Sequence, residues 1–68
     1  MKISARNKLP GVIERIEVDG LTAKVIMRSG DNCLVAVITR ESVEDMDLKV
    51  GDAVTAVIKS SSVMLAKE

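Results

Sequence analysis

Residues 12–38 form three apolar-rich segments separated by two glycine-containing turns, and this pattern constrains the fold more than any other feature of the chain. The first two segments, VIERIEV and LTAKVIMR, are rich in β-branched residues and largely alternate apolar with polar side chains. Between them, Asp19-Gly20 is a strong signal for a two-residue hairpin, because both central positions of a type I′ turn need a positive φ. The sequence SGDN predicts a second turn. The pattern therefore predicts antiparallel strands joined by short hairpins.

The third segment, CLVAVI (residues 33–38), is apolar on both faces. A strand of this kind is normally covered on both sides. Because one small sheet cannot cover both of its own faces, we expect another subunit to cover one of them. Cys33 belongs to this segment and has no histidine partner, so we expect it to be a buried and unreactive core residue.

The segment TRESVEDMDL interrupts the strand pattern. Thr39 can cap a short helix, and Glu41 in the first turn is favoured by the helix dipole. Val43 and Met46 are three positions apart, as one buried helical face requires. A turn at Gly51 then leads into the alternating segment AVTAVIK, and SVMLA is expected to form a last short strand.

The order of these elements predicts an all-β fold, a small OB-like five-stranded barrel with one short helix. A five-stranded sandwich would give a similar order of elements, so that alternative stays open. Residues 1–68 have room for one domain with one core.

The size and composition of the chain predict association of several copies. A domain this small buries only about 60% of its unfolded surface and is usually stabilised by disulfides, a metal or oligomerisation. One cysteine and no histidine exclude an intrachain disulfide and a zinc site. The chain is 47% hydrophobic, yet it has no aromatic residue to fill a core. We therefore expect a homo-oligomer.

The composition also disfavours several functions. The formal net charge is zero and there are no aromatic residues, which argues against nucleic-acid binding. No apolar run is long enough to cross a membrane, MKISARN does not resemble a signal peptide, and a lone thiol suits the cytoplasm. Without histidine as a general base, we expect no enzymatic activity and no cofactor. The acidic residues 41–47 do not match a calcium-binding loop.

Cations lie beside hydroxyl residues near both ends of the chain. Ser4 and Arg6 are in SARN, and Lys59 and Ser60 are in KSSS. A tetrahedral oxyanion such as molybdate or phosphate needs short hydrogen-bond donors and positive charge, which these residue types supply. Thr39 and Ser42, at the expected helix start, could contribute further donors. The alternative is that these are ordinary caps, a solvated strand end and a free terminus, and the residues alone favour that alternative.

The whole chain resembles the molbindins, the single Mop-domain family of molybdate-binding proteins. The resemblance rests on KISARNKL, ITRESVEDMDLKVGD and VTAVIKSSSVML, in this order along the chain. It implies an OB-like fold, exchange of the N-terminal strand between subunits, and a homohexamer built as a trimer of dimers. It also implies that molybdate, and often tungstate, binds between subunits without being transformed, for intracellular storage and homeostasis.

The resemblance further implies which residues contact the oxyanion. Asn7 would hold the strand, and the oxyanion would lie between two subunits. An oxyanion-sensing regulatory or protein-interaction module is the alternative function, because Mop domains also occur fused to DNA-binding or transporter domains. The implied oxyanion-binding residues are Ser4, Ala5 (through its backbone) and Arg6 from one subunit, and Thr39, Ser42, Lys59 and Ser60 from another, with Ser61 as a further donor.

Overall fold

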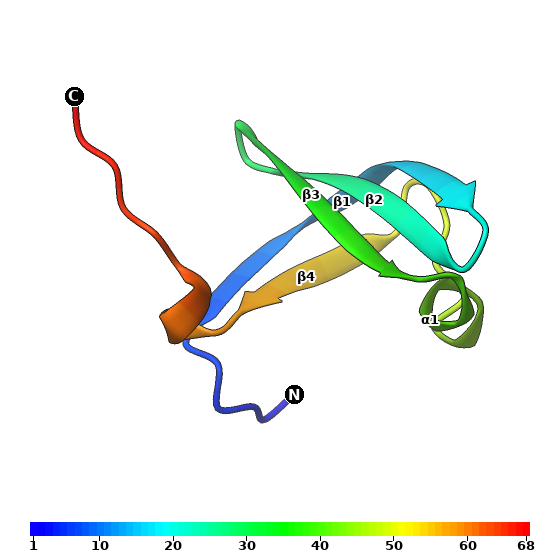
Figure 1. Ribbon diagram of the computed structural model, residues 1–68, viewed down its shortest axis with the longest axis horizontal. Helices are drawn as coiled ribbons and strands as arrows, with labels where there is room; N and C mark the ends of the chain where they lie inside the picture. The colour runs from blue at the N-terminus through cyan, green and yellow to red at the C-terminus, as the bar shows by residue number, and fades with distance from the viewer.

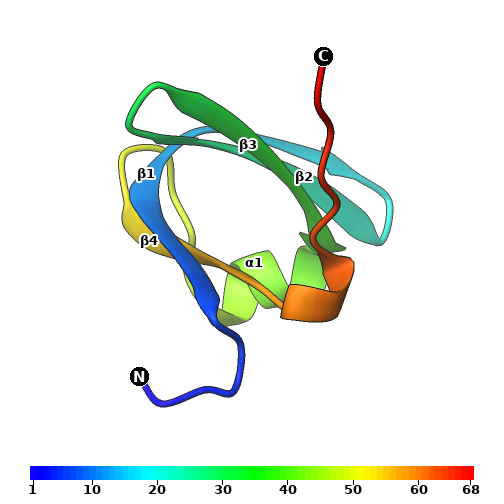
Figure 2. The ribbon, with the colours of Figure 1, turned by 90° about the vertical axis from the view of Figure 1, so that its left-hand side faces the viewer.

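A computed structural model describes all 68 residues, and its main element is a four-stranded antiparallel sheet that curls into a half-barrel (Figures 1 and 2). The strand order is β3-β2-β1-β4, so β3 and β4 are the free edges. The all-β, OB-like expectation is confirmed, although one chain contributes four strands instead of five. The elements are β1 (Asn7–Asp19), β2 (Thr22–Ser29), β3 (Asn32–Thr39), α1 (Arg40–Asp45), β4 (Ala53–Ile58) and the 3₁₀ turn η1 (Ser60–Ser62).

Both predicted hairpins are present, but the first loop lies one residue later than predicted. Asp19 pairs with Thr22, so the loop residues are Gly20 and Leu21. Gly20 has a φ of +62°, and neither Asp19 nor Leu21 has a positive φ. A glycine at the first central position is typical of a type II′ turn, and only this position requires a positive φ. The second hairpin repeats the arrangement, with Gly30 at a φ of +61°.

The long strand β1 lies in the middle of the sheet and bends partway along. Its first half pairs with β4 and its second half with β2, and its register with β2 shifts between Ile13 and Arg15. Such a bulge bends a strand and increases its twist. Ile13 then bonds to the loop before β4, since its N–H donates to Asp52 O (3.0 Å) and its carbonyl oxygen accepts from Gly51 N (2.8 Å). The bend therefore directs the sheet into its curl.

The buried core is small and lies on the concave side of the sheet. Only Ile13, Ala23, Val25 and Met27 are buried. The predicted alternation along β2 is confirmed for the last three of these residues. Leu21, expected on the same face, is instead 87% exposed because it belongs to the hairpin loop.

The helix α1 begins and ends with recognisable caps. Thr39 is the N-cap, as predicted, and its Oγ1 accepts a hydrogen bond from Ser42 N (3.0 Å). At the other end Asp47 has a φ of +49°, and Leu48 N donates to Val43 O (3.0 Å). These features form a Schellman-type C-cap.

Further expectations for the single chain are wrong, and Met46, expected on a buried helical face, is 64% exposed. The segment SVMLA forms no strand: its first residue, Ser62, ends η1, and residues 63–68 extend away from the sheet (Figure 1). A strand needs a neighbouring edge, and η1 directs this segment away from both edges of its own sheet. Cys33 is exposed instead of buried, because it lies on the outward face of β3. Val35 and Val37 on β3 are likewise exposed, while Leu34 and Ile38 are half-buried.

Candidate functional site

The two sequence motifs SARN and KSSS lie side by side in the folded chain. Asn7, the first residue of β1, pairs with Ile58, the last residue of β4. The side-chain Nδ2 of Asn7 also donates a hydrogen bond to the carbonyl oxygen of Ile58 (3.3 Å). Arg6 and Lys59 therefore leave the sheet at the same end, where β1 begins and β4 ends (Figure 1). The predicted strand-holding role of Asn7 has a physical basis in this hydrogen bond.

This end of the sheet carries free cations and free hydroxyl groups. Neither Arg6 nor Lys59 is in an ion pair within the chain, although four other cations are. Lys59 precedes η1 and its carbonyl oxygen accepts from Ser62 N (2.8 Å), which closes the turn. We call Ser4, Arg6, Lys59, Ser60 and Ser61 the cation–hydroxyl cluster; all five are exposed in the single chain.

Ala5 lies within the N-terminal part of this region. It is half-buried, while Ser4 and Arg6 on either side of it are exposed. Ala5 therefore lies between two accessible side chains of the cluster. This placement is compatible with the expected backbone contact to an oxyanion.

Thr39 and Ser42 lie at the opposite end of the molecule. Thr39 pairs with Thr22, which pairs with Asp19 at the far end of the 13-residue β1. At about 3.3 Å per residue, β1 follows a path of roughly 40 Å between its ends. Figure 1 shows α1 and η1 at opposite ends accordingly. One chain does not bring Thr39 and Ser42 to the cation–hydroxyl cluster. The expected grouping is therefore different from the observed one: a single chain places Lys59 and Ser60 with Arg6, and not with Thr39 and Ser42.

The hydroxyl groups of Thr39 and Ser42 are already engaged with each other. Their oxygens are 2.8 Å apart, and Thr39 Oγ1 also accepts from Ser42 N. Helix capping therefore accounts for part of the hydrogen bonding of Thr39 and Ser42, which agrees with the alternative that they are ordinary caps. Two hydroxyls hold two protons and only one lies between them, so one proton remains available to an acceptor.

Opposite charges gather at the two ends of the chain. The end with the cation–hydroxyl cluster carries Arg6 and Lys59, whereas Glu41 and Glu44 lie in the helix that Thr39 caps. Arg40 is ion-paired with Glu44 (3.2 Å), so Glu41 is the carboxylate of this pair that would repel an anion near Thr39. Two copies in opposite orientations would place the cations of one beside the acids of the other. The composite site implied by the sequence resemblance therefore requires at least two copies.

The 68 residues form neither a cluster of metal ligands nor a helix that could cross a membrane. No group of three or more carboxylate, cysteine or histidine residues is arranged to hold a metal ion. No helix is long and apolar enough to cross a bilayer. The adjacency of SARN and KSSS within one chain could not be predicted from the sequence. No local pattern of residues indicates that β1 begins beside the end of β4.

Comparison with known proteins gives consistent matches over nearly the whole chain. The TOBE domain family matches residues 3–65. The chain is 41% identical over 66 residues to molybdenum-pterin-binding protein 1 of Clostridium pasteurianum, covering 96% of this chain and 97% of that protein. It is also 44% identical to the molybdenum transport protein ModE of Azotobacter vinelandii, but it spans only 26% of that longer relative.

Solved structures match the fold closely. A molybdate-binding protein from Sporomusa ovata superposes with a TM-score of 0.95 at 43% identity, covering 98% of this chain and 100% of that chain. MopII from Clostridium pasteurianum gives a TM-score of 0.90 at 37% identity, covering 97% and 100%. ModG, described as a cytoplasmic molybdate-binding protein and solved with molybdate bound, gives 0.89 at 34% identity, covering 94% and 46%.

Proposed function

Because the chain belongs to the TOBE domain family and, within it, to the molbindins, we propose that it binds molybdate, and also tungstate, as intact oxyanions. The observation that carries this proposal is the cation–hydroxyl cluster, where Arg6 and Lys59 lie without ion-pair partners next to free serine hydroxyls. The oxyanion is the cargo of this protein, and the proposal includes no chemical transformation and no cofactor.

The proposed site matches the chemistry of a tetrahedral dianion. The guanidinium of Arg6 and the ammonium of Lys59 supply the two positive charges, and Ser60 and Ser61 supply short donors. We propose that Thr39 and Ser42 of a second copy complete the site, since their free hydroxyl proton can reach an anion only across an interface. Ser4 and the backbone of Ala5 would contribute from the same chain as Arg6.

The assembly is part of the proposal. We propose a homohexamer, a trimer of dimers, that stores oxyanion in the cytoplasm and keeps its free concentration steady. Only four residues are buried in a single chain, and exposed apolar side chains are frequent, so association would add a large share of the stability. Exchange of the N-terminal strand stays a prediction, and it would require β1 to exchange its pairing with both β2 and β4.

A regulatory role is the second candidate, because the chain is similar to one part of a longer relative, the molybdenum transport protein ModE, so a domain of this kind also occurs joined to other segments. In that role the chain would report oxyanion binding to a partner protein instead of storing the anion. A stable, stoichiometric complex with a partner that forms only when molybdate is present would support regulation. Binding of molybdate with no such complex supports storage.

Equilibrium dialysis with radiolabelled molybdate, in the presence of excess sulfate, tests the proposal. We expect saturable binding that tungstate displaces and sulfate does not, because a site assembled around the larger anions would hold the smaller sulfate less closely. The double variant Arg6→Ala/Lys59→Ala should lose this binding. The matched control Lys2→Ala/Lys67→Ala removes the same charge from exposed lysines outside the proposed site and should retain it. Uptake that does not saturate, or equal displacement by sulfate, would contradict the proposal.

A further inference from the structure

A third free cation, Lys8, lies beside the cation–hydroxyl cluster. Lys8 is exposed and forms no ion pair within the chain. Exposure alternates along this segment, with Asn7 half-buried and both Arg6 and Lys8 exposed on either side of it. Successive residues of an extended chain point to opposite faces, so Arg6 and Lys8 share one face. The proposed site uses only the positive charges of Arg6 and Lys59, which leaves the charge of Lys8 without a role.

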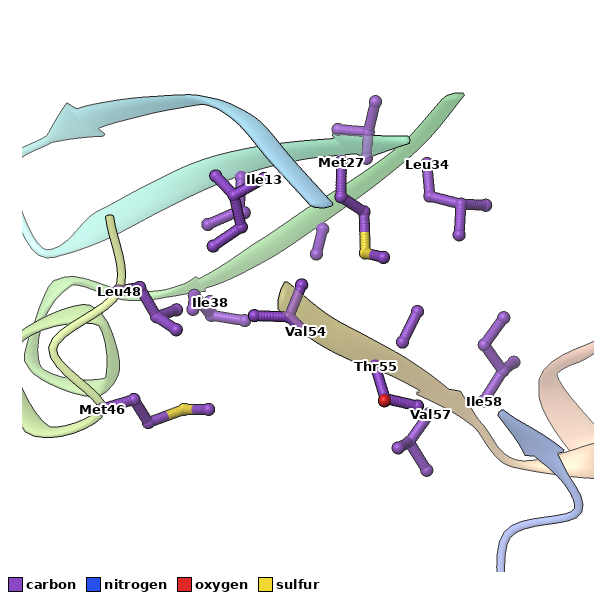
Figure 3. Close-up of a pocket in the computed structure, with 14 residues that line it drawn as sticks. Ile13, Met27, Leu34, Ile38, Met46, Leu48, Val54, Thr55, Val57 and Ile58 are labelled. Carbon is purple, nitrogen blue, oxygen red and sulfur yellow. The ribbon is translucent and has the colours of Figure 1, made fainter. Parts of the chain in front are cut away.

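Pairing between β1 and β4 brings Lys59 to the same face as Lys8. Lys8 pairs with Val57 in this ladder, and directly opposite residues share a face. Val57 and Ile58 point to opposite sides of β4 (Figure 3), and Ile58 is the more buried of the two. Lys59 follows Val57 by two positions, and its backbone is extended, with φ −64° and ψ 138°. Lys59 is therefore the diagonal neighbour of Lys8, at about 7–8 Å in a regular ladder.

A free carboxylate, Glu41, would meet these cations in the proposed composite site. Glu41 lies in the first turn of α1, two positions after the cap Thr39, and it forms no ion pair within the chain. Thr39 of a second copy can reach the cation–hydroxyl cluster only together with Glu41 of that copy. A dianion balanced by two cations would then face one carboxylate whose charge nothing else offsets.

We infer that Lys8 of one copy neutralises Glu41 of a second copy, which leaves Arg6 and Lys59 to balance the two charges of the oxyanion. The charges of the composite site then cancel, three positive against three negative. Lys8 is a charge-balancing residue and need not touch the oxyanion. The inference rests on the proposed function, because the composite site is the reason for Lys8 and Glu41 to meet.

A charge-reversal double-mutant cycle tests this pairing without any oxyanion present. The variants are Lys8→Glu, Glu41→Lys and the two together, each made in the full chain, and their Tm is measured at low and at high salt. Lys8→Glu should lower the Tm more in the wild-type background than in the Glu41→Lys background, where the exchanged charges attract. We expect this difference to be about 4 °C or more and to shrink at high salt.

Coupling between these two residues can arise only between copies. Lys8 lies near the start of β1, while Glu41 follows Thr39 at the far end of the sheet (Figure 1). β1 puts roughly 35 Å of strand between these ends, and charges are screened beyond about 10 Å in 0.1 M salt.

The control cycle combines Lys67→Glu with Glu41→Lys. Lys67 is an exposed lysine outside the cation–hydroxyl cluster, so this cycle should be additive. Additive effects in the Lys8 cycle would overturn the inference, and so would equal coupling in both cycles. If charge reversal prevents folding, Lys8→Gln and Glu41→Gln give a milder cycle, which should show coupling of the same sign.

Equilibrium dialysis with molybdate gives a second readout. Lys8→Gln should raise the Kd at least about fivefold at low ionic strength, whereas Lys8→Arg keeps the charge and should bind like the wild type. Glu41→Gln should lower the Kd, because it removes a carboxylate that repels the anion. An unchanged Kd for Lys8→Gln would overturn the inference. A wild-type chain that shows the Tm coupling but binds no molybdate would contradict the proposed function and leave the pairing standing.

Discussion

Asn7 Nδ2 donates a hydrogen bond of 3.3 Å to the carbonyl oxygen of Ile58, a residue 51 positions later in the chain. The two residues are also direct partners in the β1–β4 ladder. This contact joins the last residue of SARN to the residue that precedes KSSS, so Arg6 and Lys59 leave the sheet together. The proposed oxyanion site therefore depends on a residue that need not touch the oxyanion.

Asn7→Ala should weaken molybdate binding by more than its loss of folding stability can explain. Loss of the side-chain hydrogen bond should cost about 1 kcal/mol of unfolding free energy and leave the cation–hydroxyl cluster less well positioned. Thr22→Val is the matched control, because Thr22 Oγ1 donates to Asp19 O (3.2 Å) at the other end of β1. Equilibrium dialysis and urea unfolding, read together, should show lower affinity only for Asn7→Ala. Equal affinities for the two variants would exclude a positioning role.

Lys59→Ala should weaken molybdate binding more than Ser61→Ala. Removing the ammonium leaves a dianion short of one charge in the assembled site, whereas neighbouring hydroxyls can compensate for one lost hydroxyl. We expect at least about a tenfold difference in Kd, which corresponds to about 1.4 kcal/mol. Dialysis at fixed ionic strength measures it, and Lys67→Ala controls for the general loss of positive charge. Indistinguishable Kd values would mean that the site lies elsewhere.

Gly11→Ala should destabilise the sheet. A Cβ at this position would lie 2.2 Å from the backbone oxygen of Arg28, so the paired strands would have to separate. We expect a loss of about 1–3 kcal/mol of unfolding free energy, measured by urea unfolding followed by far-UV circular dichroism. Gly20→Ala is the comparison. A Cβ at Gly20 would have no atom within 4 Å, so this variant loses stability only because alanine disfavours a φ of +62°. Greater loss at Gly20 would show that backbone strain outweighs the clash.

Asp47→Gly should stabilise the protein. Asp47 ends α1 with a φ of +49°, a conformation that glycine adopts without steric cost. Its ion pair with Lys49 (3.0 Å) is exposed and contributes little. We therefore expect a gain of up to about 1 kcal/mol in unfolding free energy, seen as a higher Tm. Asp45→Gly, at the last helical position, should lower the Tm because glycine disfavours helical backbone there, and a lower Tm for both variants would contradict the C-cap assignment.

Local interactions made much of this fold predictable from the sequence. The glycines at positions 20 and 30 determine the hairpins, because a tight turn needs a positive φ that other residues rarely adopt. Thr39 determines where α1 begins, since its hydroxyl accepts from a backbone N–H three residues later. Alternation along β2 determines which of its side chains enter the core. Each of these features depends on residues close together in the chain.

Backbone pairing between residues distant in the sequence determines the remaining features of the fold and of the proposed site. Only the tertiary structure places Asn7 against Ile58 and separates Thr39 from Lys59 by the length of the sheet. It also decided that the apolar residues 63–66 form no strand in their own chain, because a strand exists only where an edge is available to pair with it. The sequence by itself determined the residue types of the site and the strand-forming character of this segment. Their positions depend on long-range backbone pairing, which no local pattern records.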